Sequence, residues 1–282
     1  MSLALLGLPF DANSSYLRGP ALAPPIIRAA LRSDSSNLWT ENGTDLGTEG
    51  LIVDAGDLPI SISPTEDAFA LITERTRTLV DQGFRLLALG GDHSVTYPAV
   101  RGVAKHHSKL NILHFDAHPD LYDIFEGKRY SHACPFARIM EDGLAERLVQ
   151  VGIRTMNAHQ RAQAERFGVE VIEMRNLHRA SSLRFDGPLY ISFDMDALDP
   201  AFAPGVSHHE PGGLSTREAI AMIQGVRAPQ IVAADIVELN PTRDSHGATP
   251  SGGRAQADGA APGITAMAAA KLLKEIAARM VE

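Results

Sequence analysis

The sequence predicts an α/β fold in which helices cover both faces of a parallel sheet. Short apolar segments recur along the chain, and longer segments with helical periodicity separate several of them. Strands that alternate with helices pair in parallel through right-handed crossovers. No segment resembles an interdomain linker, so we expect residues 1–282 to form a single domain.

Eight short apolar segments are the candidate strands of this sheet. They lie at 3–8, 51–54, 86–90, 111–115, 148–152, 169–173, 189–193 and 231–235. Six amphipathic or alanine-rich segments are the candidate helices. They lie at 24–32, 65–82, 95–106, 157–167, 215–226 and 264–280. Residues 242–263 are short of apolar side chains and rich in Gly, Ser, Ala and Pro, so we expect a mobile loop there.

The composition excludes several classes of protein. A hydrophobic content of 44% and a charged content of 21% are ordinary for a globular chain. The net charge of −8 argues against a nucleic-acid partner and is compatible with a cationic substrate. No apolar run approaches the roughly 20 residues of a membrane helix. The N-terminus resembles a first strand more than a signal peptide, and Cys134 is the single cysteine, so we expect a cytoplasmic protein.

Acidic residues and histidines follow four of the predicted strands. The segments are GGDHS at 90–94, DAHPD at 116–120, DMD at 194–196 and DIVE at 235–238. In open parallel sheets, ligands bind beyond the carboxyl ends of the strands. We therefore expect these polar side chains to meet at one edge of the sheet.

Six of these side chains have the chemistry and spacing of metal ligands. They are His93, Asp116, His118, Asp120, Asp194 and Asp196. Residues two apart in extended chain face the same way, and a Gly-Gly pair lets the backbone turn tightly before the first histidine. Four carboxylates in one place would repel one another without cations. Oxygen-rich ligands with some imidazole favour two Mn²⁺ ions, with Zn²⁺, Fe²⁺, Co²⁺ and Ni²⁺ left open.

Several motifs resemble those of the ureohydrolases, the family of arginase and agmatinase. GGDHS, DAHPD and SFDMDALDPAFAPG are similar to the family signatures. GPALAPPIIRAAL, YSHACPFARIM and GVSHHEPGGLS resemble plant-type arginases most closely. The similarity extends from about residue 3 to the C-terminus.

The resemblance implies a three-layer α/β/α fold with a central eight-stranded parallel sheet, and two Mn²⁺ ions in each subunit of a trimer or hexamer. One ion would be bound by His93, Asp116, Asp120 and Asp194. The other would be bound by Asp116, His118, Asp194 and Asp196. The implied reaction is the release of urea from a guanidino substrate, by attack of a metal-bridging hydroxide on the guanidinium carbon.

The resemblance also implies catalytic roles. Glu238 would pair with the planar guanidinium, and Asp120 would hydrogen-bond the bridging hydroxide. His132 matches the family's proton-shuttle histidine. Asp235 is a candidate supporting acid behind the ligands. A nucleophilic pair of His132 with Cys134 is disfavoured because the metal cluster makes it redundant.

The resemblance implies a guanidino substrate. L-Arginine is the leading candidate, and agmatine and 4-guanidinobutyrate are alternatives. Asn157 matches a position where animal arginases carry an acid that contacts the α-amino group. The loop at 121–131 offers Tyr122 and Arg129 to a substrate carboxylate, and His208 is expected to line the pocket.

Two other functions are disfavoured. Metal-dependent deacetylation does not suit DMDALDP and ELNP, which follow the ureohydrolase pattern. A catalytically silent paralogue is disfavoured because silent relatives usually lose metal ligands, and all six are present here.

Overall fold

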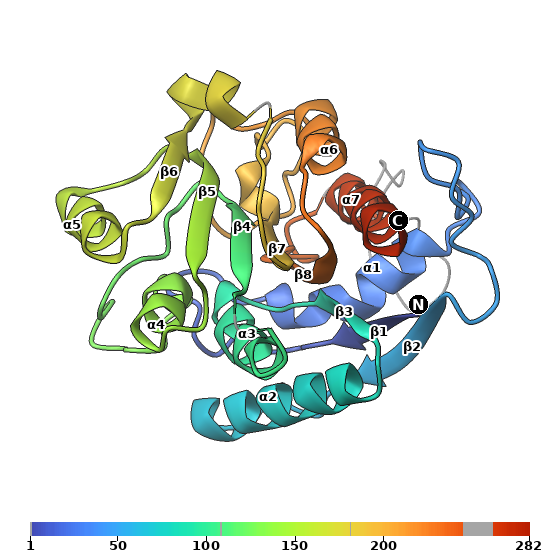
Figure 1. Ribbon diagram of the computed structural model, residues 1–282, viewed down its shortest axis with the longest axis horizontal. Coiled ribbons are helices and arrows are strands. Elements are labelled where there is room, and N and C mark those ends of the chain that lie inside the picture. The colour runs from blue at the N-terminus through green and yellow to red at the C-terminus, as the bar shows by residue number, and fades with distance from the viewer. Residues whose placement is uncertain (1, 108, 181, 245–261) are drawn as a thin grey trace, which may run out of the picture.

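The fold is built on an eight-stranded parallel sheet with strand order β2-β1-β3-β8-β7-β4-β5-β6 (Figure 1). The computed structural model describes residues 2–107, 109–180, 182–244 and 262–282. The strands are β1 Leu3–Gly7, β2 Ile52–Asp57, β3 Arg85–Leu89, β4 Asn111–Phe115, β5 Arg147–Ile153, β6 Glu170–Glu173, β7 Leu189–Asp194 and β8 Ile231–Val237. The predicted fold class and all eight predicted strands are confirmed. Residues 245–261 of the predicted loop lie outside the described residues.

Helices cover both faces of the sheet. They are α1 Ala23–Leu31, α2 Thr65–Asp81, α3 Thr96–Ala104, α4 Pro135–Glu141, α5 Ala158–Phe167, α6 Thr216–Gly225 and α7 Ile264–Val281. Helix α7 packs between α1 and α6 on one face, and α2, α3, α4 and α5 pack in succession on the other (Figure 1). The three-layer arrangement is therefore confirmed. Within the described residues, no helix is long and apolar enough to cross a membrane.

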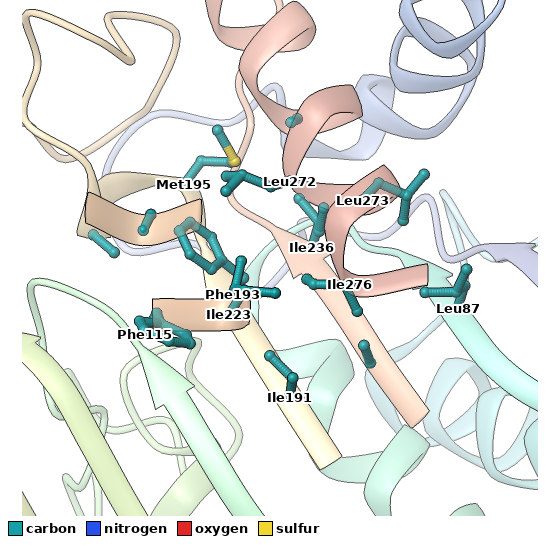
Figure 2. Packing of buried hydrophobic residues seen from close by; sticks show 14 of the residues in the cluster. Leu87, Phe115, Ile191, Phe193, Met195, Ile223, Ile236, Leu272, Leu273 and Ile276 are labelled. Atoms are coloured by element: carbon teal, nitrogen blue, oxygen red, sulfur yellow. The ribbon is translucent and has the colours of Figure 1, made fainter. Parts of the chain in front are cut away.

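Alternate residues of each central strand enter two separate hydrophobic cores. On β4, Leu113 and Phe115 join the core beneath α1, α6 and α7, whereas Ile112 joins the core beneath α2 and α3. Figure 2 shows the first core, where Phe193 and Ile236 of the sheet meet side chains of α6 and α7. Burial of each such side chain contributes roughly 1.5–3 kcal/mol. This packing holds the helices against both faces of the sheet.

Among the α-helices of the described residues, the short helix α4 is the one that sequence periodicity missed. It has seven residues, too few for a helical pattern to stand out, and it begins at Pro135. Its Phe136 is fully buried and stacks on His114 of β4, with ring centroids 3.8 Å apart. Helix α4 therefore closes the sheet face directly beneath the polar residues described next.

Candidate metal centre and substrate cavity

Four adjacent strands in the middle of the sheet carry the candidate site. Strands β3, β8, β7 and β4 are consecutive in the strand order. Because the strands are parallel, the polar segments after β3 and β4, the DMD segment at the end of β7, and Glu238 after β8 leave the sheet at the same edge. These residues converge as predicted, whereas Asp235 lies inside β8, which extends two residues further than the predicted strand.

One group of ligands surrounds His93. Its Nδ1 lies 3.2 Å from Asp116 Oδ2, and 3.1 Å from both Asp120 Oδ2 and Asp194 Oδ2. All four side chains are buried. These four residues are the set that the sequence assigned to the first metal ion.

A second group surrounds His118. Its Nδ1 lies 3.0 Å from Asp196 Oδ2 and 3.4 Å from Asp116 Oδ1, so Asp116 faces both groups. The chain reaches this arrangement through bends rather than extended alternation. Asp120 has a left-handed φ of 49°, and Asp116 Oδ1 accepts a 2.6 Å hydrogen bond from the His118 amide. The expectation that this segment stays extended was wrong, because the backbone turns as it leaves β4.

The electrostatics of the two groups fit divalent cations. The buried Nδ1 of His93 has no hydrogen-bond partner. Burial, Asp196 and Asp116 together raise the pKa of Asp194 well above its usual value. Burial and Asp116 raise the pKa of Asp120 to about 6. Cations would relieve this repulsion and use the free imidazole nitrogen, so the residues present form metal-binding groups.

A row of buried polar side chains lies one step below these ligands. Gln150 of β5, His114 of β4, Ser192 of β7 and Asp235 of β8 are in register across four neighbouring strands. All four are fully buried. The sequence predicts a supporting role only for Asp235, and the structure adds the other three.

At one end of the row, His114 orients the shared ligand Asp116. His114 Nε2 lies 2.8 Å from Asp116 Oδ2, and the Gln150 amide Nε2 lies 3.0 Å from His114 Nδ1. An amide NH₂ only donates, so Nδ1 accepts and Nε2 carries the proton that is donated to the carboxylate. Burial lowers the pKa of His114 to about 4, which keeps the ring neutral. Both ring nitrogens are thus occupied, and His114 supports Asp116 rather than joining the metal ligands.

At the other end, Ser192 and Asp235 set the tautomer of His93. Ser192 Oγ lies 2.7 Å from Asp235 Oδ1 and 3.0 Å from His93 Nε2. A carboxylate can only accept, so the serine donates to Asp235 and accepts from His93 Nε2–H. The lone pair of His93 is therefore on Nδ1, the nitrogen that faces the three carboxylates.

Glu238 has the geometry of a receptor for a cation. Its Oε1 accepts hydrogen bonds from the His93 amide at 2.9 Å and from His132 Nδ1 at 2.7 Å. Its Oε2 is buried without a hydrogen-bond partner. Burial raises the pKa of Glu238, but the neighbouring His132 brings it below the usual value. The left-handed φ of 63° costs roughly 1–3 kcal/mol, and this strain aims the carboxylate into the cavity.

His132 joins Glu238 to a residue that sequence analysis missed. Its Nε2 lies 2.8 Å from Ser15 Oγ and 3.1 Å from the Ser15 amide nitrogen. Burial opposes protonation of His132, but Glu238 prevails and raises the pKa of the imidazole to about 9. Nothing in the segment NSSYL distinguishes Ser15 from an ordinary loop serine.

A cavity of about 230 Å³ opens above the ligands. Its lining residues are Ser15, His118, Asp120, Tyr122, Phe125, His132, Ala133, Thr155, Gln160, Asp194, Asp196, His208, Glu210 and Glu238. Tyr122 and His208, predicted to contact substrate, are among them. Asn157 caps α5 and donates to Tyr122 Oη at 2.6 Å from outside the lining, and Arg129 is 51% exposed and paired with Glu141.

Comparison with known proteins identifies the family of this chain. The Arginase family model matches residues 1–278. Arginase 1, mitochondrial, of Arabidopsis thaliana is 45% identical over 293 residues, which cover 99% of this chain and 81% of that protein. The chain belongs to the arginase family. Agmatinase, mitochondrial, of Gallus gallus is 34% identical over 265 residues, covering 88% of this chain and 77% of the relative.

Solved structures agree with the family assignment. Arginase from Medicago truncatula superposes with a TM-score of 0.89 at 44% identity, covering 99% of this chain and 87% of that one. The protein is therefore a ureohydrolase of the arginase fold that carries metal-binding His and Asp groups. The resemblance stated from the motifs is confirmed.

Proposed function

We propose that this protein is an arginase that hydrolyses L-arginine to L-ornithine and urea with two Mn²⁺ ions. The observation that carries the proposal is the buried, unpartnered Oε2 of Glu238, which lines a cavity directly above two metal-binding groups. A guanidinium offers charged N–H donors to this unpartnered oxygen. The similarity to plant arginases over nearly the whole chain supports the same activity.

Six residues would hold the ions. The first would take His93, Asp116, Asp120 and Asp194, and the second Asp116, His118, Asp194 and Asp196. Oxygen and imidazole donors without thiolate suit Mn²⁺. When bound, such a pair supplies hydroxide at neutral pH.

The remaining chemistry belongs to protein side chains. Glu238 would hold the guanidinium by its free oxygen and keep the reacting carbon over the metal groups. Asp120, which lies beside His93 and lines the cavity, would hydrogen-bond the attacking oxygen and the tetrahedral intermediate. His132, bonded to Glu238 at 2.7 Å, would hold the proton that the departing amine requires.

Recognition of the substrate's far end is proposed from the cavity lining. Tyr122 and His208 would contact it directly. Asn157 would act through the Tyr122 hydroxyl that its amide holds, and Arg129 would have to leave Glu141 to reach a carboxylate. Agmatine is the second candidate. Among the described residues that line the cavity there is no Lys or Arg, and Glu210 adds negative charge.

The cell compartment and assembly are proposed on narrower grounds. We infer a cytoplasmic enzyme from the single cysteine, which is buried as a free thiol. A trimer or hexamer is inferred from the family resemblance. Mass measurement in solution tests the second inference directly.

The test is urea release by the Mn²⁺-loaded protein with L-arginine, agmatine or 4-guanidinobutyrate at equal concentration. We expect arginine to be the preferred substrate. Glu238→Gln is the matched control, since it keeps the shape of the side chain and removes the charge that pairs with guanidinium. Preference for another of the three compounds would overturn the substrate but keep the chemistry. No urea from any of them, with two ions bound per chain, would overturn the proposal.

A further inference from the structure

We propose that Ser15 is a positioning and relay residue that connects His132 to the substrate cavity. Its amide hydrogen and its hydroxyl both contact Nε2 of the imidazole, at 3.1 Å and 2.8 Å. Ser15 itself lines the cavity. The inference rests on the proposed function, in which His132 holds a proton during turnover.

The two ring nitrogens of His132 have different partners. Nδ1 faces Glu238 Oε1 at 2.7 Å, and a carboxylate accepts, so the Nδ1 proton is retained. A proton that is gained or lost during turnover is therefore the one on Nε2. Ser15 provides both polar contacts made at that nitrogen in the described part of the chain.

A hydroxyl suits both protonation states of this nitrogen. When Nε2 is bare, it accepts from the Ser15 amide and the Ser15 hydroxyl. When Nε2 carries a proton, it donates to the same hydroxyl oxygen, because Ser Oγ both donates and accepts. The amide hydrogen supports only the bare state, so it favours release of the proton once the negative charge of Glu238 is neutralised.

The proton transfer balances without any further reactant. The Nε2–H bond breaks as a new O–H bond forms on Ser15. The original hydroxyl proton leaves at the same time for the departing amine or a water molecule in the cavity. The serine ends each transfer unchanged, and the imidazole returns to its neutral form.

The segment that carries Ser15 is held firmly. Asn13 is buried, its amide donates to Asp92 Oδ2 at 2.9 Å, and its side chain donates to Ser94 Oγ at 3.0 Å. The Asn13 carbonyl accepts from the His132 amide at 3.1 Å. The serine and the histidine are therefore fixed to one another and to the loop that carries the first metal ligand.

The test compares Ser15→Ala, Ser15→Thr and Ser14→Ala in the Mn²⁺-loaded enzyme. Ser15→Ala keeps the amide contact and removes only the hydroxyl. We expect kcat to fall about 10- to 100-fold, less than the roughly 100- to 10,000-fold of a direct acid–base group, because water can replace the hydroxyl in part. KM and Mn²⁺ affinity should stay within about twofold, since the hydroxyl bonds His132 rather than a metal ligand and would meet the substrate nitrogen only as that nitrogen departs. Ser15→Thr restores the hydroxyl and should recover most of the loss. The Ser14 hydroxyl makes a long 3.5 Å contact with Asp92 Oδ2, and its amide bond to the Asp11 carbonyl survives substitution, so Ser14→Ala should match the wild type.

A second measurement tests the contact between Ser15 and His132 Nε2 directly. The ¹⁵N resonance of His132 Nε2 in metal-free protein should move in Ser15→Ala and stay in place in Ser14→Ala. An unchanged kcat in Ser15→Ala, or equal losses in the Ala and Thr variants, would overturn the relay while the wild-type activity stands. Absence of urea from the wild type would instead overturn the proposed function, on which the relay depends.

Discussion

Replacement of Ser192 by alanine should weaken metal binding although no metal ligand is replaced. Ser192 Oγ bridges Asp235 and His93, at 2.7 Å and 3.0 Å, and is fully buried. Its loss removes a hydrogen bond to a carboxylate and leaves His93 Nε2–H without an acceptor. Each such change costs roughly 1–3 kcal/mol, so we expect a total destabilisation of about 2–6 kcal/mol.

Tyr190→Phe is the matched control. The tyrosine hydroxyl also donates to Asp235, at 2.6 Å, from the same strand and from a fully buried ring. It makes no contact with His93, so its removal should cost a comparable stability of about 1–3 kcal/mol. Only Ser192→Ala frees His93 to rotate or to place its proton on Nδ1. We therefore expect Mn²⁺ affinity to fall about 10- to 100-fold in Ser192→Ala and by less than about threefold in Tyr190→Phe.

The assay is calorimetric titration of EDTA-treated protein with Mn²⁺, together with thermal unfolding of the metal-free form. For a chain of this length, each kcal/mol corresponds to about 2 °C in Tm, so both variants should melt several degrees below wild type. Equal Mn²⁺ affinities in the two folded variants would show that Ser192 does not fix the tautomer and orientation of the His93 ring. That result would refute the role proposed for the serine.

Two further outcomes follow from the geometry. Arg129→Ala should change KM for arginine by less than about twofold, because the exposed side chain pairs with Glu141 outside the cavity lining. Exposed ion pairs of this kind contribute little free energy. A large rise in KM for arginine, without a similar rise for agmatine, would show that Arg129 reaches the substrate carboxylate. Gly91→Ala should destabilise the fold by about 3 kcal/mol or more, because its Cβ would collide with the Phe10 carbonyl. The variant should therefore fail to fold stably or should melt well over 5 °C below wild type. A wild-type melting curve by circular dichroism would contradict the close packing of this loop.

Apolar runs were sufficient to predict the sheet. The six inner strands are buried on both faces, which makes their apolar segments stand out from their surroundings. The edge strands β2 and β6 are largely exposed, and their shorter apolar runs still marked them. The metal ligands were predictable for a related reason. A carboxylate directly after a buried strand, as at Asp116 and Asp194, is costly unless something pairs with it. Helix α4, with seven residues, carries too little periodicity to be seen.

Contacts between distant segments were not predictable in the same way. Ser15 meets His132 across 117 residues, and neither lies in a segment whose conformation follows from a period. Asn157 and Arg129 have side chains that could bind the substrate. In the folded chain, however, Asn157 hydrogen-bonds Tyr122 and Arg129 pairs with Glu141. Residue type indicates what a side chain can bind, whereas packing decides what it meets.

The buried polar row lies between these two cases. His114 and Ser192 each precede a predicted ligand, Asp116 or Asp194, by two residues, so they face the same side of the sheet one step below it. Because β4 and β7 pair in register, the two supports lie side by side, as the two ligands do. A single polar residue inside an otherwise apolar strand is costly unless it is bonded, and here each is bonded to a ligand or to the acid behind one. A polar residue two positions before a ligand in an apolar strand therefore predicts a side chain that supports the ligand. The prediction follows from strand alternation, which places the two side chains on the same face of the sheet.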